Sequence, residues 1–170
     1  MNEIASYPSL ENKVVIVTGG ASGIGESIVE QFVIQKSKVA FIDIEEKLAK
    51  NLIERINKKY NTKPLFIKCD LKNIFELKDS IQQVKQDLGP ISILINNAAN
   101  DERHNIDDVT SEYWDDRMNI NLKHYFFAIQ SVYKDMKKLG KGTIVNIGSF
   151  SWMIGQGGMP GYTTAKSAIM

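Results

Sequence analysis

The segment Lys13–Thr18 (KVVIVT) constrains the fold most strongly, because it is an almost uninterrupted apolar run that ends at glycines. Such a run is typical of a β-strand that is buried on both faces, as in a parallel sheet covered by helices on each side. A helical pattern follows from Gly23 to about Lys36. A strand, a glycine-rich turn and a helix in this order predict an α/β protein.

The rest of the chain repeats this alternation of short apolar runs and longer amphipathic segments. We expect further strands at Lys38–Asp43, Pro64–Asp70, Ile91–Asn96 and Gly142–Ile147, and helices at Glu45–Tyr60, Asn73–Leu88 and Ser111–Leu139. The last helix carries one apolar stripe, formed by Met118, Leu122, Tyr125, Ile129, Val132 and Met136. With right-handed crossovers, the pattern predicts a single Rossmann-type domain over residues 1–170, a doubly wound parallel sheet.

Composition excludes several classes of protein. The 170 residues include 21 basic and 20 acidic side chains, a balance that argues against a nucleic-acid partner. No apolar stretch is long enough to span a bilayer, and Met1–Lys13 lacks the pattern of a signal peptide. One cysteine, Cys69, fits a reducing cytoplasm, and His104 and His124 lack the companions of a metal site. We therefore expect a cytoplasmic protein with a small-molecule substrate.

The glycine-rich segment Thr18–Gly25 (TGGASGIG) lies between the first strand and the first helix. Backbone N–H groups of such a turn can approach a pyrophosphate, and the helix N-terminus favours its negative charge. Gly19 is assigned to the turn, Gly23 to the close approach and Gly25 to helix–strand packing. The expected cofactor contacts in this segment are Gly19, Ser22, Gly23, Ile24 and Gly25. Glycines alone leave open a flexible connection without a ligand.

Two aspartates follow the next strands. Asp43 closes the second strand, where an acid can accept hydrogen bonds from the adenosine ribose and repel a 2′-phosphate. Its presence predicts NAD rather than NADP, although a solvated turn aspartate is the alternative. Asp70 ends the third strand and is expected to reach the adenine edge, or else to cap the following helix.

Further motifs complete a recognisable set. They are NNAA at Asn96–Ala99, Asn121, Ser149 and Tyr162-x-x-x-Lys166. Together with the glycine segment, they resemble the short-chain dehydrogenase/reductase family over Lys13–Met170. Ala99 stands where that family usually has glycine. The spacing Tyr-x-x-x-Lys also occurs at Tyr133 and Lys137, but only Tyr162 has a serine thirteen residues before it.

The resemblance implies a catalytic role for four residues. An ordinary tyrosine titrates near ~10, and a lysine four residues later on the same helix face favours the phenolate. Tyr162 is thus expected to act as general base or acid. Both Tyr162 and Lys166 are also expected to contact the cofactor, and Lys166 would bind its nicotinamide ribose. Ser149 would hold the substrate oxygen, and Asn121 would support a water-mediated proton path to Lys166. Asn97 is expected to line the nicotinamide side.

The substrate is expected to contact the segments Asn100–His104 and Phe150–Met153, through Arg103, His104 and Trp152. The lead-in Tyr7–Leu10 and the segments Ala99–His104 and Gly148–Trp152 resemble bacterial sugar dehydrogenases of the D-xylose 1-dehydrogenase type, which implies oxidation of an aldose to a lactone. The alternative is that these are ordinary exposed loop residues. Within the family, a 3-oxoacyl-thioester reductase is the competing activity, although Asp43 weighs against its usual NADPH.

The number of predicted strands bears on the expected fold and activity. Five strands are visible, whereas a complete dinucleotide fold has six or more, so we expect a chain truncated at its C-terminus. Weak NADH binding and negligible sugar turnover are the corresponding expectations for these 170 residues. An inactive remnant and an oligomerising subunit are the alternatives to an active enzyme, and the resemblance implies a homo-oligomer.

Overall fold

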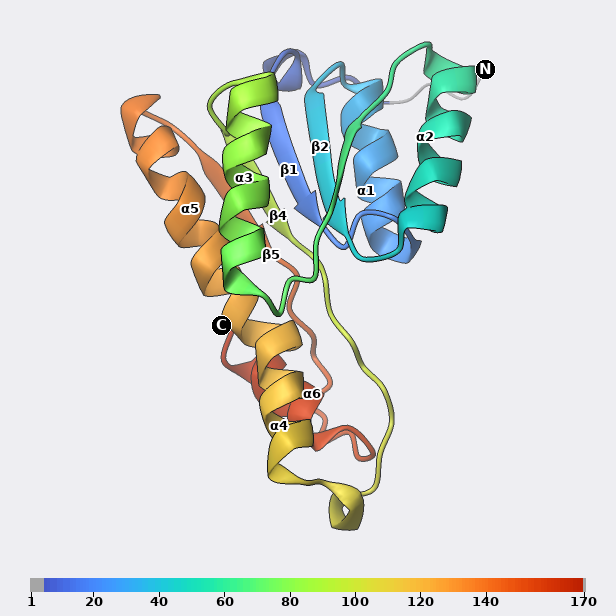
Figure 1. Ribbon diagram of the computed structural model, residues 1–170, viewed down its shortest axis with the longest axis vertical. Coiled ribbons are helices and arrows are strands. Elements are labelled where there is room, and N and C mark those ends of the chain that lie inside the picture. The colour runs from blue at the N-terminus through green and yellow to red at the C-terminus, as the bar shows by residue number, and fades with distance from the viewer. Residues whose placement is uncertain (1–4, 170) are drawn as a thin grey trace.

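The computed structural model describes residues 5–169, so the start of the segment considered for a signal peptide (Met1–Ile4) and Met170 lie outside it. Its described strands form one parallel sheet in the order β3-β2-β1-β4-β5 (Figure 1). The strands are β1 (Val14–Thr18), β2 (Lys38–Asp43), β3 (Leu65–Lys68), β4 (Ile93–Asn96) and β5 (Thr143–Asn146). The helices are α1 (Gly23–Ile34), α2 (Glu46–Tyr60), α3 (Ile74–Leu88), α4 (Ser111–Met118), α5 (His124–Lys138) and α6 (Pro160–Ser167). The predicted doubly wound parallel sheet is confirmed.

The order of the strands reverses at β1. From β1 the chain continues to β2 and then to β3, which lie on one side of β1 within the sheet. It then returns to β4, which pairs with the other edge of β1. The segments that follow β1 and β4 therefore lead to opposite faces of the sheet. In folds of this type, the crevice between such segments binds ligands. Residues Gly19 and Asn97, which directly follow these two strands, are thereby placed opposite one another.

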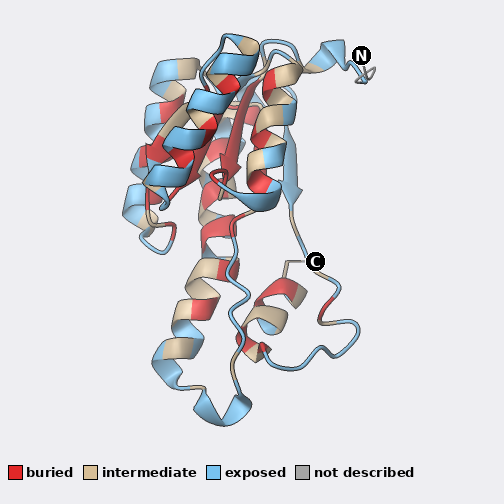
Figure 2. Cartoon of the chain, turned by 90° about the vertical axis from the view of Figure 1, so that its right-hand side faces the viewer, coloured by how far each residue is buried: buried red, intermediate tan, exposed pale blue. Residues whose placement is uncertain are grey.

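Two apolar cores lie on opposite faces of the sheet. Val15 and Val17 of β1 point toward α1 and α2, whereas Val14 and Ile16 point toward α3 and α5. Because side chains alternate along a strand, a strand buried on both faces needs apolar residues at every position. All five residues of β1 are buried, and the burial of the central strands is visible in Figure 2.

The predicted helix Ser111–Leu139 is one continuous helical path with a change of geometry inside it. Helix α4 is followed by a π-helical segment, Asn119–Lys123, and then by α5. Thr110 rather than Ser111 caps the start, since its hydroxyl accepts a hydrogen bond from the Tyr113 N–H (3.1 Å). Short π-helical segments occur frequently at functional sites, and this one contains Asn121.

Helices α4 and α6 lie beyond the carboxyl ends of the strands and contact each other there (Figure 1). An added Cβ at Gly161 would lie 2.9 Å from Cβ of Arg117, so glycine permits this close approach of α6 to α4. Strand β5 is exposed along its whole length (Figure 2). Within residues 5–169, no helix is both long and apolar enough to cross a membrane.

Candidate functional site

The glycine-rich turn has the close contacts that the sequence assigned to it. Gly19 has a φ of +66°, and an added Cβ would lie 2.8 Å from Cα of Ala98. At Gly25 an added Cβ would lie only 1.9 Å from the carbonyl oxygen of Gly19, so the start of α1 is packed against the turn. Gly23 has a φ of +56° with open space around its Cα. An added side chain would therefore collide at Gly19 and Gly25, whereas Gly23 leaves open space at the start of α1.

Side chains at the ends of β1 and β4 fix this turn in place. The Thr18 hydroxyl accepts hydrogen bonds from the N–H groups of Asn97 (3.0 Å) and Ala98 (3.2 Å). In return, the Asn97 amide donates to the carbonyl oxygens of Thr18 (3.1 Å) and Gly19 (2.9 Å). One strand further, the Asn96 amide donates to the Asn146 side chain (2.9 Å) and links β4 to β5. The asparagine pair therefore links β4 to β1 and to β5.

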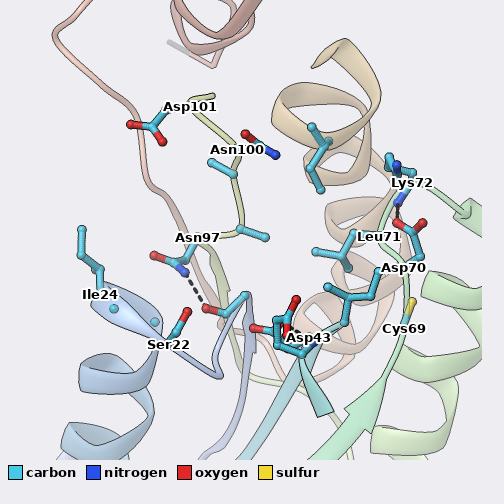
Figure 3. A pocket seen from close by; sticks show the side chains of 18 of the residues that line it. Ser22, Ile24, Asp43, Cys69, Asp70, Leu71, Lys72, Asn97, Asn100 and Asp101 are labelled. Carbon is cyan, nitrogen blue, oxygen red and sulfur yellow. Dashed lines mark hydrogen bonds between the residues drawn. The ribbon is translucent and has the colours of Figure 1, made fainter. Parts of the chain in front are cut away.

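A cavity of about 630 Å³ lies beside the glycine turn (Figure 3). It is lined by every predicted cofactor contact outside α6, namely Gly19, Ser22, Gly23, Ile24, Gly25, Asp43, Asp70 and Asn97. Residues from the ends of four neighbouring strands thus meet in one elongated space.

Asp43 lies at the end of β2 and is only 9% exposed, so it is not a solvated turn residue. One carboxylate oxygen accepts a hydrogen bond from the Ala21 N–H (2.9 Å) and the other from the Glu45 N–H (3.0 Å). Each oxygen retains further acceptor capacity toward the cavity, because an ionised carboxylate offers about four lone-pair sites. The structure therefore fits an acid that both braces the glycine turn and receives ligand hydroxyl groups.

Asp70 also lines the cavity, and the alternative role as a helix cap is wrong. The cap of α3 is Asn73, whose side-chain oxygen accepts hydrogen bonds from the N–H groups of Phe75 (3.1 Å) and Glu76 (3.3 Å). The Asp70 carboxylate instead accepts a hydrogen bond from the Lys72 N–H (3.0 Å), within the loop.

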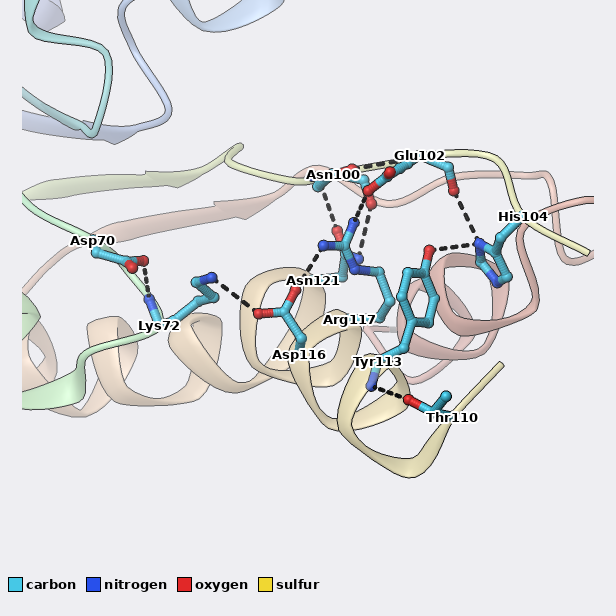
Figure 4. A network of polar contacts seen from close by, with 10 residues as sticks. All are labelled: Asp70, Lys72, Asn100, Glu102, His104, Thr110, Tyr113, Asp116, Arg117 and Asn121. Carbon is cyan, nitrogen blue, oxygen red and sulfur yellow. Dashed lines mark hydrogen bonds and ion pairs between the residues drawn. The ribbon is translucent and has the colours of Figure 1, made fainter. Parts of the chain in front are cut away.

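A network of charged side chains (Figure 4) includes three residues that line the cavity, Lys72, Asp116 and Arg117. Lys72 pairs with Asp116 (2.9 Å), Asp116 with Arg117 (2.6 Å), and Arg117 with Glu102 (3.2 Å). Burial acts against the charge of Asp116, but hydrogen bonds from Lys72 and Arg117 leave its pKa lowered overall. Both cations of the cavity lining are therefore already paired with acids.

The side chain of Lys166, one of the predicted catalytic residues, is buried. It is 1% exposed, and its ammonium donates hydrogen bonds to the Tyr125 hydroxyl (2.8 Å) and the Ile147 carbonyl oxygen (2.7 Å). Burial lowers the pKa of Lys166 to about 8. The Lys166 Nζ lies 5.7 Å from the centre of the Tyr162 ring, so the two residues are neighbours on α6.

Ser149 and Asn121 are held by other polar groups in the described part of the chain. The Ser149 hydroxyl donates to the Ser151 hydroxyl (2.9 Å) rather than to Tyr162. The Asn121 side chain, fully buried, accepts from the Asn100 N–H (2.8 Å) and donates to the Asn100 carbonyl oxygen (3.0 Å). Asn121 thus fastens the loop that follows β4.

The expected substrate residues are not gathered at one place. The His104 ring bonds to the Tyr113 hydroxyl and the Glu102 carbonyl oxygen, so it packs against α4. Arg103 is exposed, and the half-buried Trp152 lines a separate hollow beside α6. None of these three side chains lines the cavity beside the glycine turn.

Two buried residues near Lys166 were missed as site residues. His124 bonds to the Ala98 carbonyl oxygen (3.2 Å), and burial lowers its pKa to about 4, so its ring is neutral at pH 7. Burial, with a smaller contribution from Tyr162, raises the pKa of Tyr125, which stays a neutral phenol. The sequence placed Tyr125 on the apolar stripe of the helix. That pattern predicts that the Tyr125 side chain is buried, but it does not identify the hydrogen-bond partners of its hydroxyl.

The strand order, the crevice at the reversal of the sheet and the glycine turn define a Rossmann-type α/β domain. The sequence model of the short chain dehydrogenase family matches residues 13–170. This chain belongs to that family.

Individual relatives agree with this assignment. D-xylose 1-dehydrogenase of Caulobacter vibrioides is 41% identical over 165 residues, which are 97% of this chain and 64% of the relative. A probable galactose dehydrogenase of Rhizobium meliloti is 37% identical over 166 residues, covering 98% of this chain and 65% of the relative. The chain therefore spans slightly less than two thirds of the length of these curated relatives.

A solved structure shows the same arrangement of elements. The crystal structure of a protein from Sinorhizobium meliloti 1021, provisionally described as a short-chain alcohol dehydrogenase, superposes with a TM-score of 0.87 at 25% identity. The match covers 94% of this chain and 63% of that one. The fold inferred from the sequence is thereby confirmed against a solved relative.

Proposed function

We propose that the protein is an NAD-dependent oxidoreductase that transfers hydride between the nicotinamide and the anomeric carbon of an aldose. The observation that carries this proposal is the single cavity that joins the glycine turn and Asp43 to the loop fastened by Asn121. The names of the two sugar dehydrogenases that are similar to this chain support the substrate class.

The bound NAD would supply the hydride acceptor, and the residues of the chain would hold it and move the proton. The open space at Gly23 and the free N–H groups of the first turn of α1 suit a pyrophosphate. The Tyr162 side chain, as the phenolate, would take the proton of the sugar hydroxyl during oxidation, and the resulting phenol would return it during reduction. Ser149 would hold the oxygen of the reacting carbon, which requires its hydroxyl to turn away from Ser151.

The charges around the cavity favour NAD over NADP. Three acids, Asp43, Glu45 and Asp70, line the end of the cavity next to β2 and β3, and Lys72 and Arg117 are engaged with acids elsewhere. A 2′-phosphate at Asp43 would therefore meet like charge without a free cation. Ribose hydroxyls at the same place would instead donate hydrogen bonds to the carboxylate.

Replacing Asp43 with asparagine is expected to weaken NAD binding about tenfold and to reduce the preference for NAD over NADP by a larger factor. The amide loses the negative charge that repels a phosphate and keeps one acceptor oxygen, so one of the N–H groups of Ala21 and Glu45 also loses its partner. Dissociation constants for both cofactors, measured by calorimetry, test this. Asp79→Asn on α3 is the matched control, and an unchanged ratio of the two constants in Asp43→Asn would refute the role of Asp43.

The substrate class is tested by an assay of the protein produced from its own gene. We expect reduction of NAD with xylose or galactose and at most a trace of activity with a 3-oxoacyl thioester and NADPH. Activity with the thioester alone would replace the aldose proposal by the competing reductase. Failure to bind either cofactor would favour the inactive remnant over both.

We also propose a cytoplasmic location and association into a homo-oligomer. The thiol of Cys69, the single cysteine, is buried and its pKa is raised to about 11 by burial, which suits a reducing compartment. The apolar side chain of Phe126, which is 64% exposed on α5, supports association between copies.

A further inference from the structure

The ammonium of Lys166 is held by a tyrosine that lies on another helix. We propose that Tyr125 is a positioning residue, which fixes the Lys166 ammonium so that its remaining N–H group serves Tyr162 and the cofactor. This inference rests on the proposed function, because it assigns a task within that reaction. It concerns the hydroxyl of Tyr125 alone, since the ring packs as an ordinary part of the buried stripe of α5.

The hydrogen bonds around Lys166 account for two of its three N–H groups. The Tyr125 hydroxyl (2.8 Å) and the Ile147 carbonyl oxygen (2.7 Å) are the two acceptors of this ammonium among the described residues. A lysine ammonium carries three donors and no acceptor. One N–H group therefore remains for the side occupied by Tyr162, whose ring centre lies 5.7 Å from Nζ.

The Tyr125 hydroxyl is itself fixed by the ends of two strands. It donates toward the Ile147 carbonyl oxygen (3.2 Å), which follows β5, and lies 3.4 Å from the Ala98 carbonyl oxygen, which follows β4. Because the hydroxyl proton is engaged there, its oxygen lone pairs face Lys166. Tyr125 is 3% exposed, so water does not compete for this position.

This contact also joins α6 to the sheet. Helix α6 contacts α4 and the π-helical segment, and the Lys166 ammonium reaches from α6 to the carbonyl oxygen of Ile147, which follows β5. Tyr162 lies one turn before Lys166 on the same short helix. Fixing the ammonium therefore also fixes the part of α6 that carries the proposed acid–base residue.

The first test follows the titration of Lys166 by nuclear magnetic resonance of ¹³Cε-lysine-labelled protein, with Lys166→Arg used to assign the signal. In the unsubstituted protein we expect a pKa of about 8. Tyr125→Phe removes an acceptor that stabilises the charged form, so the pKa of Lys166 is expected to fall by about 1 unit. Tyr133→Phe, on the exposed side of α5, is the matched control and leaves the titration unchanged.

Enzyme kinetics provide the second readout. With NAD and an aldose, Tyr125→Phe is expected to lower kcat about tenfold and to change KM for the sugar less than twofold. Because the Lys166 ammonium is then lost at lower pH, the upper limb of the pH profile is expected to move to lower pH. A purely structural tyrosine would lower the melting temperature without moving that limb. If the unsubstituted protein shows no turnover, the proposed function fails, whereas the Lys166 titration still decides the role of Tyr125.

An unchanged Lys166 titration in folded Tyr125→Phe would overturn the inference. If this variant does not fold, the contact is tested in the unsubstituted protein. There the Lys166 Nζ lies 4.9 Å from the centre of the Tyr125 ring, so nearby protons of the two side chains are close enough for nuclear Overhauser contacts. Nuclear Overhauser contacts between the Lys166 ε-protons and the Tyr125 ring protons would then support the inference. Their absence would refute it.

Discussion

Tyr162→Phe is expected to reduce kcat for aldose oxidation by a factor of about 10² to 10⁴, the range that general acid–base catalysis contributes. The substitution removes the hydroxyl that we propose exchanges the proton, and it keeps the ring, which is half-buried on α6. Affinity for NAD is expected to change less than threefold, since the glycine turn and Asp43 lie on other elements. Steady-state kinetics and calorimetry measure the two quantities separately.

The second Tyr-x-x-x-Lys motif offers a control for this experiment. Tyr133 and Lys137 have the same spacing on α5, but the Tyr133 side chain is 45% exposed and lies away from the cavity beside the glycine turn. Tyr133→Phe is expected to leave kcat within a factor of two. A Tyr162→Phe protein that retains more than a tenth of the activity would remove Tyr162 from the proton transfer.

Gly25→Ala is expected to lower the free energy of unfolding by about 3 kcal/mol and to weaken NAD binding at least about tenfold. The added Cβ would lie 1.9 Å from the Gly19 carbonyl oxygen and 2.7 Å from the Asn97 amide nitrogen. Since one of these atoms belongs to the backbone, the turn itself must move. Urea denaturation and calorimetry with NAD measure the two effects.

Gly157→Ala is the matched control for that substitution, because an added Cβ there meets nothing within 4 Å and the backbone is not in the left-handed region. It is expected to change the free energy of unfolding by less than about 0.5 kcal/mol. Normal NAD affinity in a folded Gly25→Ala protein would show that the turn tolerates displacement and does not govern cofactor binding.

The sequence predicted the sheet well because the relevant signal is local. A continuous apolar run such as β1 can be stable only with both faces covered, so its environment follows from its own residues. The segments around Asp43 and Asn96 ended where expected, because polar residues and turns follow the strands directly. The predicted β3 was longer than the observed Leu65–Lys68, since apolar and polar residues mix at its ends.

The π-helical segment could not be predicted, because Asn119–Lys123 has no composition that distinguishes it from an ordinary helix. Contacts between distant segments were equally hidden. Lys72 and Asp116 are 44 residues apart in the sequence, and neither shows a local sign of pairing. Asn121 was found from the family resemblance, whereas its bonds to Asn100 required the folded chain.

The π-helical segment has a consequence for insertions and deletions in this region. Each residue of an α-helix advances the direction of the side chains by about 100°, so deleting one residue from Asn119–Lys123 would leave both flanking helices formed but turned relative to each other. If α4 kept its contact with α6, the apolar stripe of α5 would rotate away from the sheet. Tyr125 would leave Lys166 at the same time. The number of residues in this segment, and not only their identity, therefore sets the rotation of α5 relative to α4, so that the apolar stripe of α5 faces the sheet and Tyr125 faces Lys166.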